Sequence, residues 1–435
     1  MNPITVGILG STVLIILLVL GMPIAFVTMF VGFLGISYLT SIHGALTVVA
    51  NTVYEMATNY TFSIVPLFII MGKFAGDAGI THKLYETFDK WFRRLPGGLG
   101  IATVVACAFF GAISGSSIAA AAAMGTVAIP EMRRFHYAPK LAVGVVAAGG
   151  TLSFMIPPSL GFVVYGMLTE QSIGKLLIAG ILPGILLSLV FIALIIAQVA
   201  MDPSLAPVAA QKVSWKEKLF ALSGVWETLL VFFLVMGGIF RGFITPNEAG
   251  AIGATALFLI IVLKRRLTFN NFFASLLEAG RISAMVIFLT AGATVFSYFF
   301  ALSTIPVAVS QWMAGLQVSK YIILSIIVGI YLVLGCFLDS LSMMVLTLPI
   351  VLPVIVALGF DPIYFGVVCV LMMEAGLITP PVGLNVYTLA GMVKDTSMEE
   401  IFRGALPFVI CIIAITILIT AFPIIALFLP QMMVK

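Results

Sequence analysis

The feature that most constrains this chain is the length of its apolar segments. Crossing a hydrocarbon core of roughly 30 Å takes about 20 apolar residues as an α-helix, and several segments reach that length. The 435 residues are 62% hydrophobic and 9% charged, whereas a soluble domain carries about 25% charged residues. Backbone groups in lipid must be paired internally, so the sequence predicts an all-α polytopic membrane protein. The predicted spans are 3–20, 23–41, 62–79, 141–170, 175–200, 219–240, 247–264, 283–302, 363–393 and 404–430.

The remaining composition argues against several other classes of protein. The sequence lacks a basic patch interleaved with aromatic residues, so nothing in it indicates a nucleic-acid partner. The four cysteines lie in apolar segments without a C-x-x-C spacing, so they are predicted to be small buried residues. The N-terminal MNPITVGILG lacks the positive region of a cleaved signal peptide, so the first span is expected to be retained. Residues 43–60 include Asn51 and Glu55 and are predicted to lie at the membrane interface.

Two of the predicted spans, 141–170 and 363–393, are too long for one straight helix, and each contains a Pro-Pro pair. Proline removes a backbone donor and clashes with the preceding turn, so a helix is expected to break there. Pro157-Pro158 and Pro380-Pro381 therefore predict two broken transmembrane helices. The alternative is a pair of short helices joined by an ordinary loop.

The two Pro-Pro pairs also belong to an internal repeat. They are 223 residues apart, as are Pro23 and Pro246, and SGSS at 114–117 lies opposite LDSLS at 338–342 in the same frame. Several landmarks at one offset favour duplication over coincidence. The predicted organisation is a first repeat at 1–201, a polar cytoplasmic linker at 202–218 and a second repeat at 219–435.

The basic loops determine the predicted orientation of the repeats. Loops 81–97 and 131–140 are both rich in Lys and Arg, which favours the cytoplasm for both. One transmembrane helix between them would place them on opposite sides, so residues of about 98–130 are predicted to form a re-entrant hairpin that turns at SGSS. The same counting places a second hairpin, about 320–358, on the opposite side, so the repeats have inverted topology. An even number of spans leaves both termini outside the cytoplasm.

The hairpin tips and the Pro-Pro breaks are the candidate sites. Irregular backbone at membrane depth is tolerated beside a watery cavity, and broken helices in inverted repeats hold ions and substrates there. Hydroxyl and carbonyl oxygens are hard neutral ligands that suit Na⁺ rather than transition metals. Gly115, Gly150 and Gly376 are expected to let the backbone bend so that carbonyls converge. The alternative is that these small residues only allow close helix packing.

Two acidic residues, Asp339 and Glu374, lie deepest in apolar sequence. A carboxylate within the membrane is a functional-site hypothesis by default. Asp339 is at a predicted hairpin tip, which favours a functional role. Glu374 begins the second break and fits a functional role and a structural one equally.

At these clusters the chain resembles the large membrane subunit of TRAP transporters, the tripartite ATP-independent periplasmic transporters. The motifs that carry the resemblance are LGMPIAF, GAISGSS, IPPS and ITPPVGLN, and it runs through essentially the whole chain. It implies an elevator-type fold like that of the ion transporter superfamily, in a multi-pass protein of the bacterial inner membrane with both termini periplasmic. It also implies a Na⁺-coupled importer, not an enzyme, that carries an organic acid such as sialic acid or a C4-dicarboxylate.

The resemblance further implies partners and site residues. The expected partners are a small four-helix membrane subunit on a separate chain, a periplasmic substrate-binding protein and membrane lipids. Two or more Na⁺ ions are expected, with no organic cofactor and no transition metal. An ion channel and an intramembrane serine protease are the alternative functions, although a protease needs a base at depth and the three histidines lie in polar loops. The implied sodium ligands are Ser114, Gly115, Gly150, Thr151, Met155, Ser340, Gly376 and Thr379, and the implied substrate contacts are Ser116, Ser159 and Asp339.

Overall fold

The computed structural model describes residues 1–207, 213–308, 318–393 and 395–433, and within these ranges the protein is helical without strands. Five helical stretches are long and apolar enough to cross a membrane, and the number rises to eight if each of three bent helix pairs is one span. Several helices of 10–17 residues are apolar but shorter. The prediction of a polytopic all-α protein is confirmed at this level.

The helices of the first half are short on average and are often interrupted. Asn2 and Ser41 cap the helices that follow them with their side chains, and Pro23 begins another, so the starts have local causes. The elements are α1 Pro3–Val19, α2 Ile24–Leu39, α3 Ile42–Thr58, α4 Ile64–Asp77, α5 Ile80–Phe92, α6 Gly98–Ser114, α7 Ser117–Arg134, α8 Pro139–Met155, α9 Leu160–Thr169, α10 Ile173–Ala179 and α11 Ile181–Met201.

The second half contains a longer central helix and a similar series of short ones. Capping boxes begin three of its helices, at Ser214, Thr245 and Ser397. The elements are α12 Trp215–Ala221, α13 Trp226–Phe232, α14 Gly238–Phe240, α15 Pro246–Leu263, α16 Phe269–Leu302, α18 Lys320–Gly335, α19 Ser340–Ala357, α20 Pro362–Gly376, α21 Leu384–Met392, α22 Met398–Ala421 and α23 Ile424–Met432.

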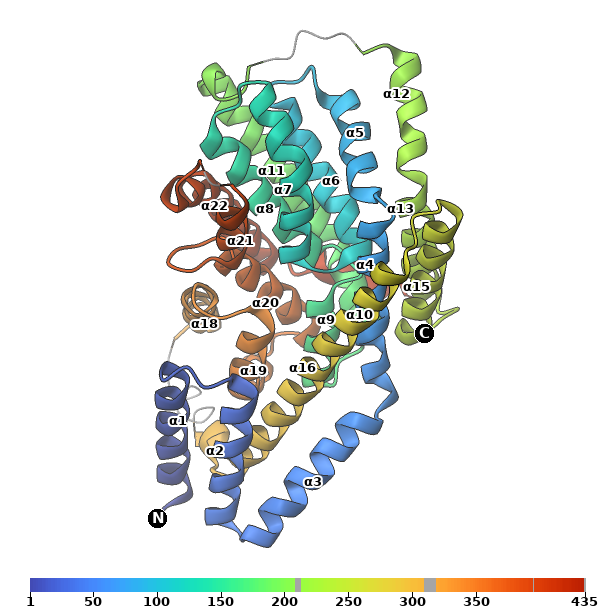
Figure 1. Cartoon of the computed structure of the whole chain (residues 1–435). Helices are drawn as coiled ribbons and strands as arrows, with labels where there is room; N and C mark the ends of the chain where they lie inside the picture. The colour runs from blue at the N-terminus through green and yellow to red at the C-terminus, as the bar shows by residue number, and fades with distance from the viewer. Residues whose placement is uncertain (208–212, 309–317, 394, 434–435) are drawn as a thin grey trace.

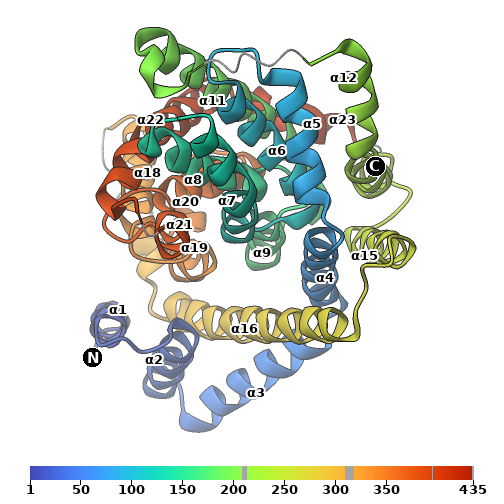
Figure 2. The same cartoon turned by 45° about the horizontal axis from the view of Figure 1, so that its top comes forward.

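The long helix α16 divides the molecule into two parts. Figure 2 shows α1, α2 and α3 on one side of α16, and the bundle that contains α6–α11 and α18–α22 on the other. A small separate core joins α16 to α1–α3 through residues such as Val31 and Phe299. A Cβ atom at Gly35 of α2 would lie 2.2 Å from the Phe299 ring, so a glycine is required for this close approach.

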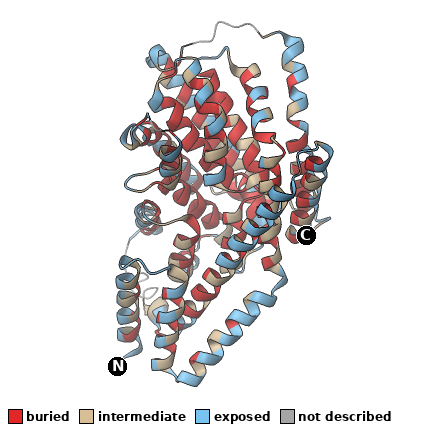
Figure 3. Cartoon of the chain, in the orientation of Figure 1, coloured by how far each residue is buried: buried red, intermediate tan, exposed pale blue. Residues whose placement is uncertain are grey.

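The large bundle is densely buried, whereas α1 and α3 expose much of their surface (Figure 3). Helix α8 is the centre of the bundle, and all residues from Leu141 to Met155 are buried. In a membrane protein the exposed apolar side chains of the outer helices face lipid, so exposure there carries no penalty.

Residues 98–134 form a hairpin whose two ends lie together. Helices α6 and α7 are joined by only two residues, and at the far end the Leu99 N–H donates to the Tyr137 hydroxyl at 3.1 Å. Burial raises the pKa of Tyr137 to about 12, so the phenol stays neutral. The observed hairpin is four residues longer than the predicted 98–130, because Arg133 and Arg134 extend the last turn of α7, where basic residues favour the helix dipole.

Several predicted spans differ from the observed helices; 363–393, for example, is divided between α20 and α21, with residues 377–383 between them. The span 283–302 is the second part of α16, which begins at Phe269 because Thr268 caps it and because Glu278 pairs with Lys73 at 2.5 Å. The span 219–240 bends by 45° between α12 and α13, and 404–430 is divided between α22 and α23 near Pro423. Hydropathy alone could not predict these ends, because caps and ion pairs allow polar residues in a helix.

For two segments outside the bundle, residues 43–60 and the linker 202–218, the structure tests only part of what was predicted. Residues 43–60 form α3, which meets the next helical segment at a 51° bend; the interfacial position stays a prediction. The linker 202–218 begins with a short turn in which the Leu205 carbonyl accepts from the Ala138 N–H at 2.9 Å. Its residues 208–212 lie outside the described ranges. The two repeats and their inverted topology also stay predictions.

Candidate functional site

The tip of the first hairpin lies against the first Pro-Pro pair. Gly115 has a left-handed backbone with φ of +61°, and a Cβ atom there would lie 2.6 Å from the Pro158 carbonyl oxygen. The Gly115 carbonyl accepts from the Leu160 N–H at 3.5 Å. Ser116 caps α7, since its hydroxyl accepts from the Ala119 N–H at 3.3 Å. The hairpin tip and the segment around Pro157-Pro158 are therefore in direct backbone contact.

The first Pro-Pro pair separates α8 from α9, which bend by 44° relative to each other. Ser159 is fully buried and its hydroxyl donates to the Phe154 carbonyl. Thr151, eight residues before Ser159 and within α8, is also fully buried, and its hydroxyl donates to the Ala148 carbonyl at 2.6 Å. The buried Ser114 hydroxyl at the tip has no partner in the described residues, which leaves its oxygen available to an ion.

The structure corrects the role expected for Gly150. This residue lies inside α8, whose helix continues unbroken to Met155, so the backbone does not bend there. A Cβ atom at Gly150 would lie 2.9 Å from the Ala121 side chain and 3.0 Å from the Ser117 carbonyl of α7. Its observed role is close packing of α8 against α7, which is the alternative considered for the small residues.

The second hairpin tip has the same relation to the second Pro-Pro pair. The Cys336 carbonyl, between α18 and α19, accepts from the Val382 N–H at 3.2 Å, directly after Pro380-Pro381. A Cβ atom at Gly376, the last residue of α20, would lie 2.4 Å from the Gly335 backbone. The ends of α18 and α20 therefore come into backbone contact at this pair of glycines. Gly376 has no left-handed backbone, and its function there is again close approach rather than a bend.

Three predicted residues of the second tip lie around this contact. Asp339 caps α19, and its carboxylate accepts from the Ser342 N–H at 3.1 Å. Ser340 begins the same helix and is buried, and the Thr379 hydroxyl donates to the Ala375 carbonyl at 2.6 Å. The first-half residues thus gather at one tip and the second-half residues at the other; no direct contact joins Asp339 with Ser116 or Ser159 among the described hydrogen bonds.

A third polar cluster connects the halves, and sequence reasoning did not assign it as a site. The Asn385 amide, in α21, donates to the Ser117 hydroxyl at 2.8 Å and to the Ala147 carbonyl at 3.2 Å. The Ser117 hydroxyl also lies near the carboxyl group of Glu374. The available signal was the final asparagine of ITPPVGLN and the last serine of SGSS, since both are polar residues in apolar sequence.

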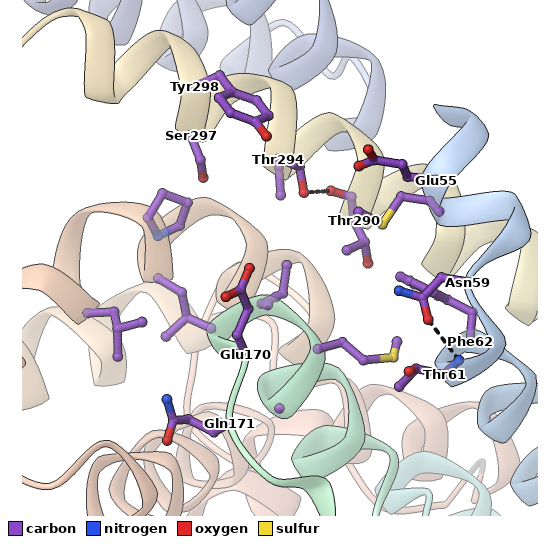
Figure 4. Close-up of a pocket in the computed structure, with 18 of the residues that line it drawn as sticks. Glu55, Asn59, Thr61, Phe62, Glu170, Gln171, Thr290, Thr294, Ser297 and Tyr298 are labelled. Atoms are coloured by element: carbon purple, nitrogen blue, oxygen red, sulfur yellow. Dashed lines mark hydrogen bonds between the residues drawn. The ribbon is translucent and has the colours of Figure 1, made fainter. Parts of the chain in front are cut away.

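A cleft of about 950 Å³ lies between α16 and the bundle. Figure 4 shows Glu170, after α9, and Glu55, on α3, as the two carboxylates at this cleft. No Lys or Arg is found among its described lining residues, and none of the implied ligand residues lines it. Its walls are Glu55, Met56, Thr58, Asn59, Thr61, Phe62, Gly166, Met167, Leu168, Glu170, Gln171, Ile173, Thr290, Ala293, Thr294, Ser297, Tyr298, Ala301, Leu348, Pro349, Leu352 and Pro353.

The donor chemistry of these sites is hydroxyl and carbonyl oxygen. Among the described residues, no group of three or more His, Cys, Asp or Glu side chains gathers as a metal site. The side chains at the tips fit an alkali cation, because Na⁺ accepts neutral oxygen ligands at helix ends and in unwound segments.

The sequence matches the family described as "Tripartite ATP-independent periplasmic transporter, DctM component" over residues 11–425. A C4-dicarboxylate TRAP transporter large permease protein of Pseudomonas aeruginosa is 34% identical over 385 residues, which are 88% of this chain and 89% of that protein. The sialic acid TRAP transporter large permease protein of Vibrio cholerae is 32% identical over 419 residues, or 96% of each chain.

Among solved structures, that of Neisseria gonorrhoeae MtrF, described as illuminating a class of antimetabolite efflux pumps, is similar to this fold with a TM-score of 0.61. The identity is 13%, and the similarity covers 98% of this chain and 95% of MtrF. At this identity the similarity shows the fold alone. The resemblance expected from the motifs is confirmed by the family match.

Proposed function

This chain belongs to the DctM family of tripartite ATP-independent periplasmic transporters, and from that premise we propose that it imports an organic acid together with Na⁺, which moves inward down its gradient. The family and its named relatives are transporter permeases, so the chain is a multi-pass membrane transporter subunit rather than an enzyme. Na⁺ coupling, the carried acid and the mechanism are the proposed part.

The observation that carries the proposal is the matched pair of tip contacts. In each half a hairpin-tip carbonyl accepts from an N–H one or two residues after a Pro-Pro pair: Gly115 from Leu160 and Cys336 from Val382. Such paired, broken elements support an inverted repeat with an ion site in each half. The first site contains Ser114, Gly115, Gly150, Thr151 and Met155, and the second Ser340, Gly376 and Thr379; Ser116, Ser159 and Asp339 contact the substrate.

The two-part architecture supports an elevator movement. In this proposal α1–α4, α15 and α16 stay fixed, while the bundle with both tips carries the substrate across the membrane. The cleft of about 950 Å³ between α16 and the bundle supports this division, because it leaves part of the boundary between the two parts unpacked.

Relatives named for C4-dicarboxylates and for sialic acid support one of these as the substrate. The chain would work in a bacterial inner membrane with a separate small membrane subunit and a periplasmic binding protein. Both of its termini would lie in the periplasm, and both hairpins would be re-entrant.

Uptake measured in proteoliposomes tests the coupling. With the small subunit and the loaded binding protein present, an inward Na⁺ gradient should drive accumulation of the labelled acid, and dissipating that gradient should abolish it. Undiminished uptake in Na⁺-free buffer under a proton gradient alone would refute the proposal.

The re-entrant hairpin has its own test. Arg94→Cys and Arg134→Cys lie at the two ends of the first hairpin, at exposed positions, and each is made in a background without the four native cysteines. Both should react with an impermeant thiol reagent only from the cytoplasmic side. Reaction from opposite sides would mean that residues 98–134 cross the membrane.

A further inference from the structure

The carboxyl group of Glu374 is buried without any partner that neutralises it. The residue is 1% exposed, and among the described residues neither carboxylate oxygen completes a hydrogen bond, although the Ser117 hydroxyl lies near the carboxyl group. None of the ion pairs in the described part of the chain includes it. A buried charge is retained in proteins when a counter-charge or a metal ion compensates it.

Asn385, which contacts the same Ser117 hydroxyl, also has a buried oxygen without a partner in the described residues. Asn385 is fully buried, and its two amide hydrogens are used by the Ser117 hydroxyl and the Ala147 carbonyl. The Asn385 side-chain oxygen, in contrast, has no partner. Two carboxylate oxygens and one amide oxygen are therefore buried acceptors without a completed hydrogen bond. The Ser117 hydroxyl near the carboxyl group has one proton and so can satisfy one of them at most, and its second lone pair can be offered to a cation.

We propose that Glu374, Asn385 and Ser117 form a further Na⁺ site, at the seam where the first hairpin meets the second broken helix. A cation satisfies every unpaired acceptor at once, which no single protein donor in the described cluster does. One carboxylate balances one positive charge, so a monovalent ion leaves the buried site neutral while Mg²⁺ or Ca²⁺ would not. Oxygen-only ligands argue against soft transition metals, so the single charge selects a monovalent, hard cation.

The site shares no side chain with the two ion sites proposed above, and it joins the halves of the chain. Ser117 begins α7 in the first half, whereas Glu374 and Asn385 lie on either side of the second Pro-Pro pair. An ion there holds the first hairpin against the second break, so its binding favours one relative position of the two tips. This inference rests on the proposed Na⁺ coupling for the identity of the ion.

Equilibrium binding of ²²Na⁺ to the full chain, purified with the subunits that remain bound, tests the site. Glu374→Gln keeps the shape of the side chain and removes its charge. We expect it to bind one Na⁺ fewer per chain than the parent protein, or to bind that ion at least tenfold more weakly. Glu399→Gln is the matched control, because Glu399 is exposed on α22 and pairs only with Arg403 in the described ion pairs. The number of Na⁺ ions bound per chain should be the same in this variant as in the parent protein.

The outcomes separate this site from the proposed function. Unchanged Na⁺ binding in Glu374→Gln overturns the site and makes Glu374 a neutral structural residue; equal competition by K⁺ overturns its assignment to Na⁺. Loss of all Na⁺ from that variant also overturns it, because Glu374 would then serve the tip sites. A parent protein that binds no Na⁺ refutes the coupling as well, whereas normal binding with Na⁺-independent uptake refutes the coupling alone. If Glu374→Gln does not fold, Ser117→Ala decides by the same criteria.

Discussion

The two hairpin tips are built alike but differ in their exposure. At the first tip Thr151 and Ser159 are fully buried, whereas at the second Thr379 is half-buried and Pro380 and Pro381 are exposed. The Phe337 side chain, at the second tip, is 60% exposed. The same arrangement of tip and break thus occurs in two environments within one conformation.

The difference follows from what surrounds each tip. The first tip is covered from several directions: the Ser114 carbonyl lies against Gly72 of α4, and the Met155 carbonyl lies against Gly180 before α11. The second break meets the Gly335 backbone and the Phe402 ring, while the side of Pro380-Pro381 stays open. Similar contacts therefore occur at both tips, but burial depends on which other helices lie next to each tip.

The largest expected effect is at the exposed tip. Asp339→Asn keeps the cap of α19, since an asparagine oxygen accepts the same Ser342 N–H, but it removes the charge. We expect a correctly folded protein whose uptake falls roughly 10- to 100-fold, the equivalent of one charge-assisted interaction of about 1.5–3 kcal/mol, and whose Na⁺ dependence weakens. The measurement is initial uptake in proteoliposomes against the Na⁺ concentration.

Asp361→Asn is the matched control for this charge. Asp361 caps α20 with the same kind of contact, to the N–H of Ile363 at 2.7 Å, but it lies away from both tips. Its uptake should stay within about twofold of the parent, as expected for an exposed residue whose cap is conserved in the variant. A fall in thermal stability of Asp339→Asn, with uptake that keeps a normal Na⁺ dependence, would make Asp339 a purely structural cap.

The next effect concerns the difference in exposure itself. In a background without the native cysteines, Thr379→Cys should react with a small thiol reagent on the order of tenfold faster than Thr151→Cys, because a buried side chain reacts only after local opening. Substrate and Na⁺ should change both rates if the tips exchange environments during transport. Equal rates in every condition would remove the distinction between an enclosed tip and an open one.

The last comparison concerns folding stability rather than transport, and it tests the backbone at the tips. Gly115→Ala places a Cβ atom 2.6 Å from the Pro158 carbonyl oxygen at a left-handed residue, so it adds a clash to the strain. The strain costs about 1–2 kcal/mol, and the clash adds about 1–3 kcal/mol. Unfolding in detergent should therefore show a larger loss of unfolding free energy for Gly115→Ala than strain alone would cause. Gly359→Ala supplies the comparison, because its φ is +74° with no atom within 4 Å, so only the strain applies. Equal losses of unfolding free energy in Gly115→Ala and Gly359→Ala would mean that the Pro158 carbonyl oxygen does not restrict the space at Gly115.

Much of the fold could be predicted because its causes are local. An apolar stretch of about 20 residues must pair its backbone internally, and a helix cannot continue normally through a proline pair. The helices α8 and α20 accordingly end at Met155 and Gly376, before Pro157 and Pro380. Gly115 was recognisable as a turn residue for the same kind of reason, because a left-handed backbone favours glycine.

The tertiary structure decided the rest. Gly150 and Gly376 were predicted to let the backbone bend because they are glycines. In the structure they allow close packing, because the backbone or side chains of a neighbouring helix lie against each of them. The meeting of Ser117, Glu374 and Asn385 joins residues more than 250 positions apart, and the cleft beside α16 depends on helices from both halves. Periodicity, hydropathy and motif spacing describe a chain one segment at a time. Which segments approach each other, and which of two similar tips they enclose, depends on side-chain packing across the whole bundle, which is a property of all the helices together.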